Sequence, residues 1–195
     1  MVKKQNILYC HGFNSSAQAQ KAQQFQAALL NTPYQAHVPN LAYDPEVAFL
    51  QLHQLMQRLQ PVMLVGSSLG GFYATVLAEQ YQCPAVLLNP SVTPAHTLQA
   101  VVNQIQYSAA QACDYTFLPA YVETLARQTP TQIDPQRYFV VLTTGDEVLD
   151  YRAAQTHYHG CAGLIISGNT HQIAHFEDFL PPIMRFIDER CAMRI

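Results

Sequence analysis

The chain has 195 residues, of which 49% are hydrophobic, so a single compact domain spanning residues 1–195 is expected. A formal charge of −3, with only 10 scattered Lys and Arg residues, provides no basic surface for nucleic acid, and no nucleic-acid partner is expected. The five cysteines are widely spaced and form no C-x-x-C pair, which excludes a disulfide framework and a zinc knuckle and favours a reducing compartment.

The first apolar run, residues 7–10, is closed by His11 and Gly12, which is typical of a buried strand that ends in a turn. It is too short for a signal-peptide core or a membrane span, so we expect a cytoplasmic protein without a membrane partner. Further strands are predicted at residues 35–39, 61–66, 85–88, 138–142 and 163–166.

Helical periodicity and end signals predict helices between these strands, at residues 18–30, 45–60, 69–81, 150–159 and 173–190. The alternation of strands and helices predicts an α/β fold with a mostly parallel central sheet and helices on both faces. Ligands are expected at the carboxyl ends of the strands.

About 45 residues separate the fourth and fifth predicted strands, far more than an ordinary connection in a compact domain. This segment has partly helical periodicity and several aromatic residues, and it predicts a helical cap-like insertion at about residues 91–136. Such an insertion is expected to roof a small or medium apolar pocket, although each of its tyrosines would equally suit core packing.

The residues Gly66-x-Ser68-x-Gly70 match a nucleophile elbow, in which a serine occupies a strained turn between a strand and a helix. The pattern alone is short, but a predicted strand precedes it and a predicted helix follows it, as the motif requires. Ser68 is therefore the candidate nucleophile.

The turn after the first strand is where this architecture places one backbone donor of an oxyanion hole. We expect the amide of Phe13 to be that donor, with Asn14 as the alternative, and the amide of Leu69 to be the second. The imidazole of His11 is expected to serve only as a structural hydrogen-bonding group.

The candidate acid is Asp146, directly after the fifth predicted strand, and Asp150 is its rival. Because Asp150 precedes a helical run, we assign it to capping that helix. His171 follows the last predicted strand and is the candidate base. His175 would share a helix face with His171, but no H-E-x-x-H pattern is present, so no metal site is expected.

The order Ser68, Asp146, His171 is the chain order of α/β-hydrolases. Five segments also resemble the YqiA/YcfP-like bacterial esterases over nearly the whole chain. They are residues 9–16 (YCHGFNSS), 66–74 (GSSLGGFYA), 88–91 (LNPS), 144–151 (TGDEVLDY) and 168–171 (GNTH).

The resemblance implies an α/β-hydrolase fold and hydrolysis of carboxylic esters, acyl thioesters included, without a cofactor. It places Ser68, Asp146 and His171 at the family's triad positions. The chain departs from the family pattern Gly-x-x-His-x-Phe at Ile173, which bears on the shape of the pocket rather than on the base. Two alternatives stay open: a non-catalytic binding protein of this fold, and a hydrolase or acyltransferase acting on amides or other acyl substrates.

Overall fold

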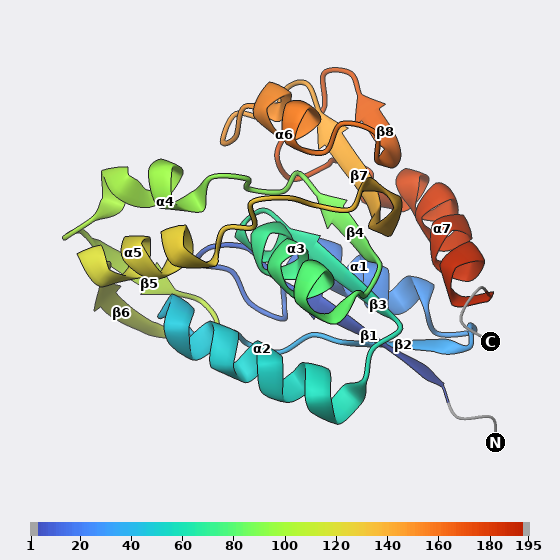
Figure 1. The fold of residues 1–195 in the computed structure, drawn as a ribbon, viewed down its shortest axis with the longest axis horizontal. Helices are drawn as coiled ribbons and strands as arrows, with labels where there is room; N and C mark the ends of the chain where they lie inside the picture. Colours follow the sequence, from blue (N-terminus) through green and yellow to red (C-terminus); the bar gives the residue numbers. More distant parts are fainter. Residues whose placement is uncertain (1–3, 193–195) are drawn as a thin grey trace.

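The computed structural model describes residues 4–192 and is built around a six-stranded sheet in which all neighbouring strands are parallel (Figure 1). The strands are β1 (Gln5–Cys10), β2 (Tyr34–His37), β3 (Met63–Ser67), β4 (Ala85–Leu88), β7 (Tyr138–Thr143) and β8 (Ala162–Ile166). Their order in the sheet is β2-β1-β3-β4-β7-β8. The register pairs Cys10 with Gly66 and Ser67 with Leu88, so β1, β3 and β4 end side by side.

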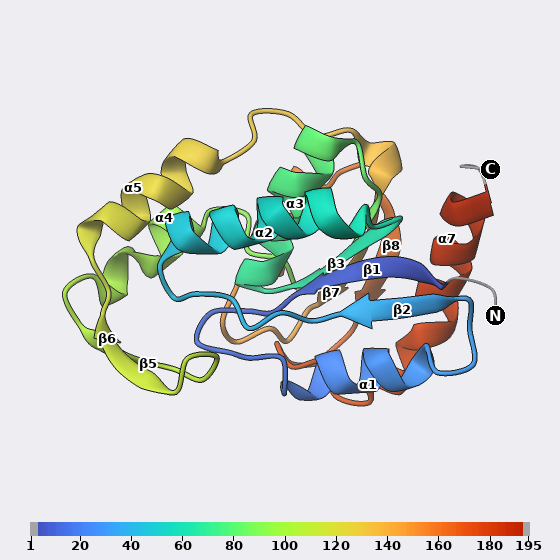
Figure 2. The same ribbon diagram turned by 90° about the horizontal axis from the view of Figure 1, so that it is seen from below.

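Helices cover both faces of this sheet, as the alternation of elements predicts (Figure 2). They are α1 (Gln20–Ala28), α2 (Pro45–Leu59), α3 (Leu69–Tyr81), α4 (Pro94–Thr97), α5 (Pro119–Gln128), α6 (Tyr151–His157) and α7 (Leu180–Ala192). Short 3₁₀ helices lie at Leu98–Val101, Pro135–Arg137 and Phe176–Phe179.

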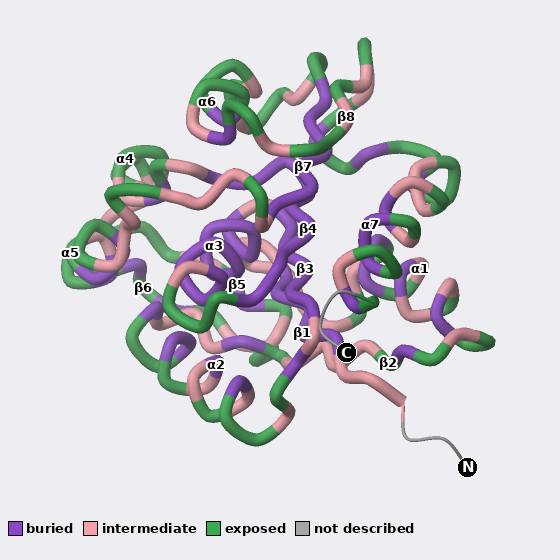
Figure 3. Tube along the Cα trace, turned by 45° about the vertical axis from the view of Figure 1, so that its right-hand side comes forward, coloured by how far each residue is buried: buried purple, intermediate pink, exposed green. Residues whose placement is uncertain are grey.

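Two apolar cores form because successive side chains of a strand point to opposite faces of the sheet. Leu8 and Leu64 pack in the core under α2, α3 and α6, whereas Ile7 and Val65 pack in the core under α1 and α7. The inner strands β3, β4 and β7 are buried along their length, β1 is buried from Ile7 onward, and the edge strand β8 is more exposed (Figure 3). The predicted α/β-hydrolase architecture is confirmed.

The segment from residue 91 to residue 136 lies beyond the carboxyl ends of the strands (Figures 1 and 2). It contains α4 and α5, but it also contains an antiparallel hairpin of β5 (Ile105–Ser108) and β6 (Cys113–Thr116). The hairpin was not predicted: both strands alternate apolar and polar residues, but each is only four residues long, and the segment around them has partly helical periodicity.

The predicted helix at residues 173–190 is wrong in its first part, since α7 begins only at Leu180. Ile173 and His175 have left-handed backbone angles, with φ of 55° and 57°, and the side chain of Asn169 hydrogen-bonds to both main-chain groups of Ala174. His171 and His175 therefore do not share a helix face, which removes the geometric basis for a metal pair.

Among the residues that the structure describes, no helix is long and apolar enough to cross a bilayer.

Candidate active site

Ser68 lies between β3 and α3, in the strand–turn–helix context that the sequence predicts. Its backbone angles, φ 56° and ψ −123°, fall in a region that residues other than glycine rarely occupy. A Cβ atom on Gly70 would overlap the carbonyl of Cys10, and one on Gly66 would overlap the carbonyl of Gly70. The two glycines are thus required for β1, β3 and α3 to approach closely enough to form this turn.

The loop after β1 runs past Ser68, and a Cβ built on Gly12 would lie 3.1 Å from the Cβ of Ser68. His11 fixes this loop: its Nε2 accepts from the amide of Leu41 at 3.0 Å, so its Nδ1 carries the proton and donates to the carbonyl of Gly12 at 3.0 Å. Burial lowers the pKa of His11, which favours this neutral form. The imidazole therefore has the structural role that the sequence predicts.

The carbonyl of Gly12 also accepts from the amide of Ser15 at 3.2 Å, so the peptide between Gly12 and Phe13 is held in one orientation. In a trans peptide the N–H points away from the carbonyl, and the amide of Phe13 is directed away from His11. Within residues 4–192, neither this amide nor that of Leu69 has a hydrogen-bond acceptor. Both predicted oxyanion donors are thus available to a ligand.

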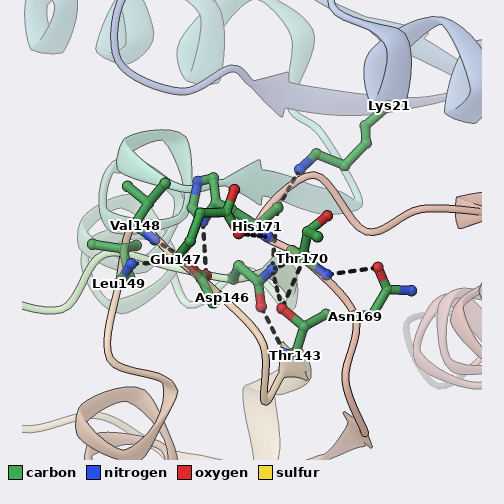
Figure 4. A network of polar contacts seen from close by, with 10 residues as sticks. Lys21, Thr143, Asp146, Glu147, Val148, Leu149, Asn169, Thr170 and His171 are labelled. Atoms are coloured by element: carbon green, nitrogen blue, oxygen red, sulfur yellow. Dashed lines mark hydrogen bonds and ion pairs between the residues drawn. The ribbon is translucent and has the colours of Figure 1, made fainter.

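The structure brings Asp146 and His171 together, with Asp146 Oδ2 2.7 Å from His171 Nδ1 (Figure 4). The other oxygen of Asp146 accepts from the amides of Val148 and Leu149, both at 2.8 Å. Burial alone would raise the pKa of Asp146, but the hydrogen bonds from His171 and the two amides outweigh it and hold the pKa below its usual value. Asp146 is therefore an ionised acceptor that orients His171, and Nε2 of His171 has no hydrogen-bond partner within residues 4–192.

Asp150 is at the start of α6, where its side chain accepts from the amide of Arg152 at 3.0 Å. This is the capping role to which the sequence assigns it. Asp150 makes no contact with His171 among the described residues.

Three polar side chains that the sequence analysis did not identify hold the His171 loop. Lys21 Nζ donates to the carbonyl of His171 at 3.0 Å (Figure 4). Asn89 Nδ2 donates to the same oxygen at 3.2 Å. Glu147 Oε2 accepts from the amide of His171 at 3.0 Å, and this bond lowers the pKa of Glu147. Two signals were visible in the sequence: a lysine on the apolar face of a predicted helix, and an asparagine directly after a buried strand.

Ser68 and His171 line one cavity of about 270 Å³. They are not hydrogen-bonded to each other, and catalytic hydrogen bonds of this kind often close only when substrate is bound. The other lining residues include polar Gln20, Lys21 and Gln172 and apolar Phe13, Ala19 and Val148. No residue of the 91–136 segment lines this cavity, but Ser108 and Tyr115 of the segment line a neighbouring pocket together with Phe13 and Leu69.

No group of three or more His, Cys, Asp or Glu side chains within residues 4–192 has the geometry to hold a metal ion.

Comparisons with known proteins agree with this architecture. The model of the uncharacterised protein family UPF0227 matches residues 6–188. The structure is similar to Est1E from Butyrivibrio proteoclasticus, with a TM-score of 0.76 at 14% identity over 98% of this chain and 90% of that chain. It is also similar to a monoacylglycerol lipase from Paleococcus ferrophilus, with a TM-score of 0.70 at 13% identity over 95% and 94% of the two chains. For α/β hydrolase domain-containing protein 10 from mouse the TM-score is 0.71 at 12% identity, over 97% and 92%.

Proposed function

The chain belongs to the uncharacterised protein family UPF0227, and for this member we propose a serine hydrolase that cleaves carboxylic esters. The observation that carries the proposal is the 2.7 Å hydrogen bond between Asp146 and His171, on a cavity that His171 shares with a serine in a strained elbow. A nucleophile, a base and a group that orients the base form the arrangement that nucleophilic acyl transfer needs.

In the proposed mechanism His171 Nε2 takes the proton of Ser68 Oγ while that oxygen attacks the acyl carbon. The amides of Phe13 and Leu69 hold the resulting oxyanion. His171 then gives the proton to the leaving alcohol, which departs with the bonding electrons and leaves an acyl group on Ser68. Water, deprotonated by His171, releases the acid and restores Ser68, while Asp146 stays ionised and fixes the tautomer of His171 throughout.

The substrate class is a small-molecule carboxylic ester, with acyl thioesters as a close chemical relative. One structural neighbour, Est1E, is known with ferulic acid bound, so an aromatic acyl group belongs among the compounds to test. The cavity wall combines polar Gln20, Lys21 and Gln172 with apolar Phe13, Ala19 and Val148, which suits an acyl group with both an apolar part and a hydrogen-bonding group.

The experiment is a panel of p-nitrophenyl esters of increasing chain length, a feruloyl ester, an acyl-CoA and an anilide, tested on wild-type protein, Ser68→Ala and Ser67→Ala. We expect ester turnover by wild type, loss of it in Ser68→Ala, and a folded, active Ser67→Ala. Exclusive turnover of the anilide would replace the esterase by an amidase. A protein that turns over nothing and does not react with a fluorophosphonate would be the non-catalytic binding protein.

We also propose a single domain over residues 1–195 with the 91–136 segment as its cap, and a cytoplasmic location. No disulfide bond is present among residues 4–192, which suits a reducing compartment. Fractionation of cells that express the tagged protein tests the location.

A further inference from the structure

The hairpin of the 91–136 segment contacts the loop that carries the proposed oxyanion donor Phe13. The contact is made through Asn14, whose side-chain amide uses both of its ends. Tyr115 Oη donates to Asn14 Oδ1 at 2.8 Å, and Asn14 Nδ2 donates to Gln106 Oε1 at 3.0 Å. Gln106 and Tyr115 are directly paired across β5 and β6, so one rung of the hairpin binds the whole amide group.

Aromatic packing fixes this rung in place. The ring of Tyr115 stacks on Tyr43 at 4.0 Å between centroids, and Phe117 packs edge-on against Phe13 at 5.7 Å. The hairpin turn adds a hydrogen bond from the amide of Tyr43 to Gln111 Oε1 at 3.0 Å. Tyr115 is buried, and burial raises its pKa, so its hydroxyl stays protonated and able to donate.

The backbone of Asn14 links this contact to the proposed oxyanion donor. Asn14 has a left-handed φ of 54°, directly after the peptide whose N–H is the proposed oxyanion donor. His11 and Ser15 hold that peptide from one side through the carbonyl of Gly12, and the hairpin holds the following residue from the other. An oxyanion donor stabilises the transition state best when it is fixed before the reaction, because reorienting a mobile dipole costs free energy.

We propose that Gln106 and Tyr115 are positioning residues that fix the oxyanion loop through Asn14, so the cap segment acts on catalysis from outside the cavity. This inference rests on the proposed function. Tyr115 also lines a pocket with Phe13 and Leu69, next to the cavity that Ser68 and His171 share, and no residue of the segment lines that cavity itself.

The test compares Tyr115→Phe, which keeps the stacked ring and loses the donor, with Tyr107→Phe as the matched control. Tyr107 lies on the same hairpin, but its side chain is 55% exposed. With p-nitrophenyl acetate, Tyr115→Phe should lower kcat about tenfold and change KM by less than about twofold, because the lost interaction serves the transition state. Tyr107→Phe should change neither parameter.

A double-mutant cycle shows whether Tyr115 acts through Asn14. Asn14→Gly keeps access to the left-handed backbone and removes the side chain. In that background Tyr115→Phe should have no further effect on kcat, whereas effects that multiply would overturn the proposal.

Hydrogen–deuterium exchange of peptides covering residues 11–16 gives a readout that does not depend on turnover. Tyr115→Phe should exchange faster there than wild type and Tyr107→Phe. Unchanged exchange overturns the inference even if the protein is an active esterase, and faster exchange with unchanged kcat overturns the positioning role. A wild-type protein that hydrolyses no ester overturns the proposed function instead, and the exchange data then still decide whether the hairpin holds the loop.

Discussion

Lys21 provides a sharp test of the electrostatics around the base, because its ammonium group is buried. Burial lowers its pKa from 10.5 to about 8, although the nearby carboxylates of Asp146 and Glu147 oppose this. Each pKa unit corresponds to about 1.4 kcal/mol, so keeping Lys21 charged costs the folded protein about 3 kcal/mol at pH 7. Lys21→Met removes this cost together with one neutral-acceptor hydrogen bond worth about 1 kcal/mol, so it should stabilise the protein by about 2 kcal/mol.

The pH dependence gives the sign of the effect. The cost is fully present below pH 8, where Lys21 is charged in both states, and it disappears as the pH rises towards 10.5, because only the unfolded chain then binds the proton. The stability of wild type relative to Lys21→Met should therefore rise between pH 8 and pH 10 in urea denaturation. Lys4→Met is the control, since Lys4 also donates to main-chain carbonyls but its bond to Leu30 is exposed.

Lys21→Met should lower the activity of the protein although it raises its stability. Without Lys21 the carbonyl of His171 loses one of its hydrogen bonds and keeps the one from Asn89, so the base is held less firmly and kcat should fall about threefold to tenfold. The reasoning is refuted if Lys21→Met is less stable than wild type at pH 7, or if the difference between them does not shrink by pH 10.

Three further predictions concern the proposed acid, the glycine of the elbow, and the hydrogen bond between Tyr138 and Glu79. Asp146→Asn should lower kcat/KM by about a thousandfold or more. Asp150→Asn should lower the free energy of unfolding by only about 1 kcal/mol, because it weakens the cap of α6, and it should keep most of the activity. Equal kinetic losses in the two variants would contradict the assignment of the acid. Gly70→Ala should abolish activity and lower the thermal midpoint, because its Cβ overlaps the carbonyl of Cys10; a stable, active variant in thermal scans and ester assays would contradict the crowded elbow. Tyr138→Phe removes the 2.5 Å hydrogen bond to Glu79 and should lower the free energy of unfolding by about 1–3 kcal/mol in urea denaturation, while kcat stays unchanged. A large loss of kcat would contradict the purely structural role of this hydrogen bond.

The sheet could be predicted from the sequence because its strands are continuous apolar runs that end in turn residues. Ala85–Leu88 matches its prediction residue for residue, and the other strands differ by a few positions at their ends. The positions of Ser68, Asp146 and His171 follow from this, since each lies within about five residues after a predicted strand and parallel strands end at one edge.

The parts that were missed depend on contacts between distant residues. Lys21 and Asn89 meet at the carbonyl of His171 from positions 150 and 82 residues away, and no local pattern encodes that meeting. The left-handed angles at Ile173 and His175 are set by the side chain of Asn169, so a helical pattern of apolar residues gave a helix that begins too early. The hairpin is likewise held by Asn14 and Tyr43, which lie far from it in the chain.

The most direct measurement for the proposed serine hydrolase is the site of covalent reaction with a fluorophosphonate, read by mass spectrometry of the digested protein. The account predicts one adduct, on Ser68, which forms slowly in Asp146→Asn and not at all in Ser68→Ala, while Ser67→Ala reacts like wild type. An adduct on another residue, or a folded wild-type protein that carries none and hydrolyses no ester, would contradict it.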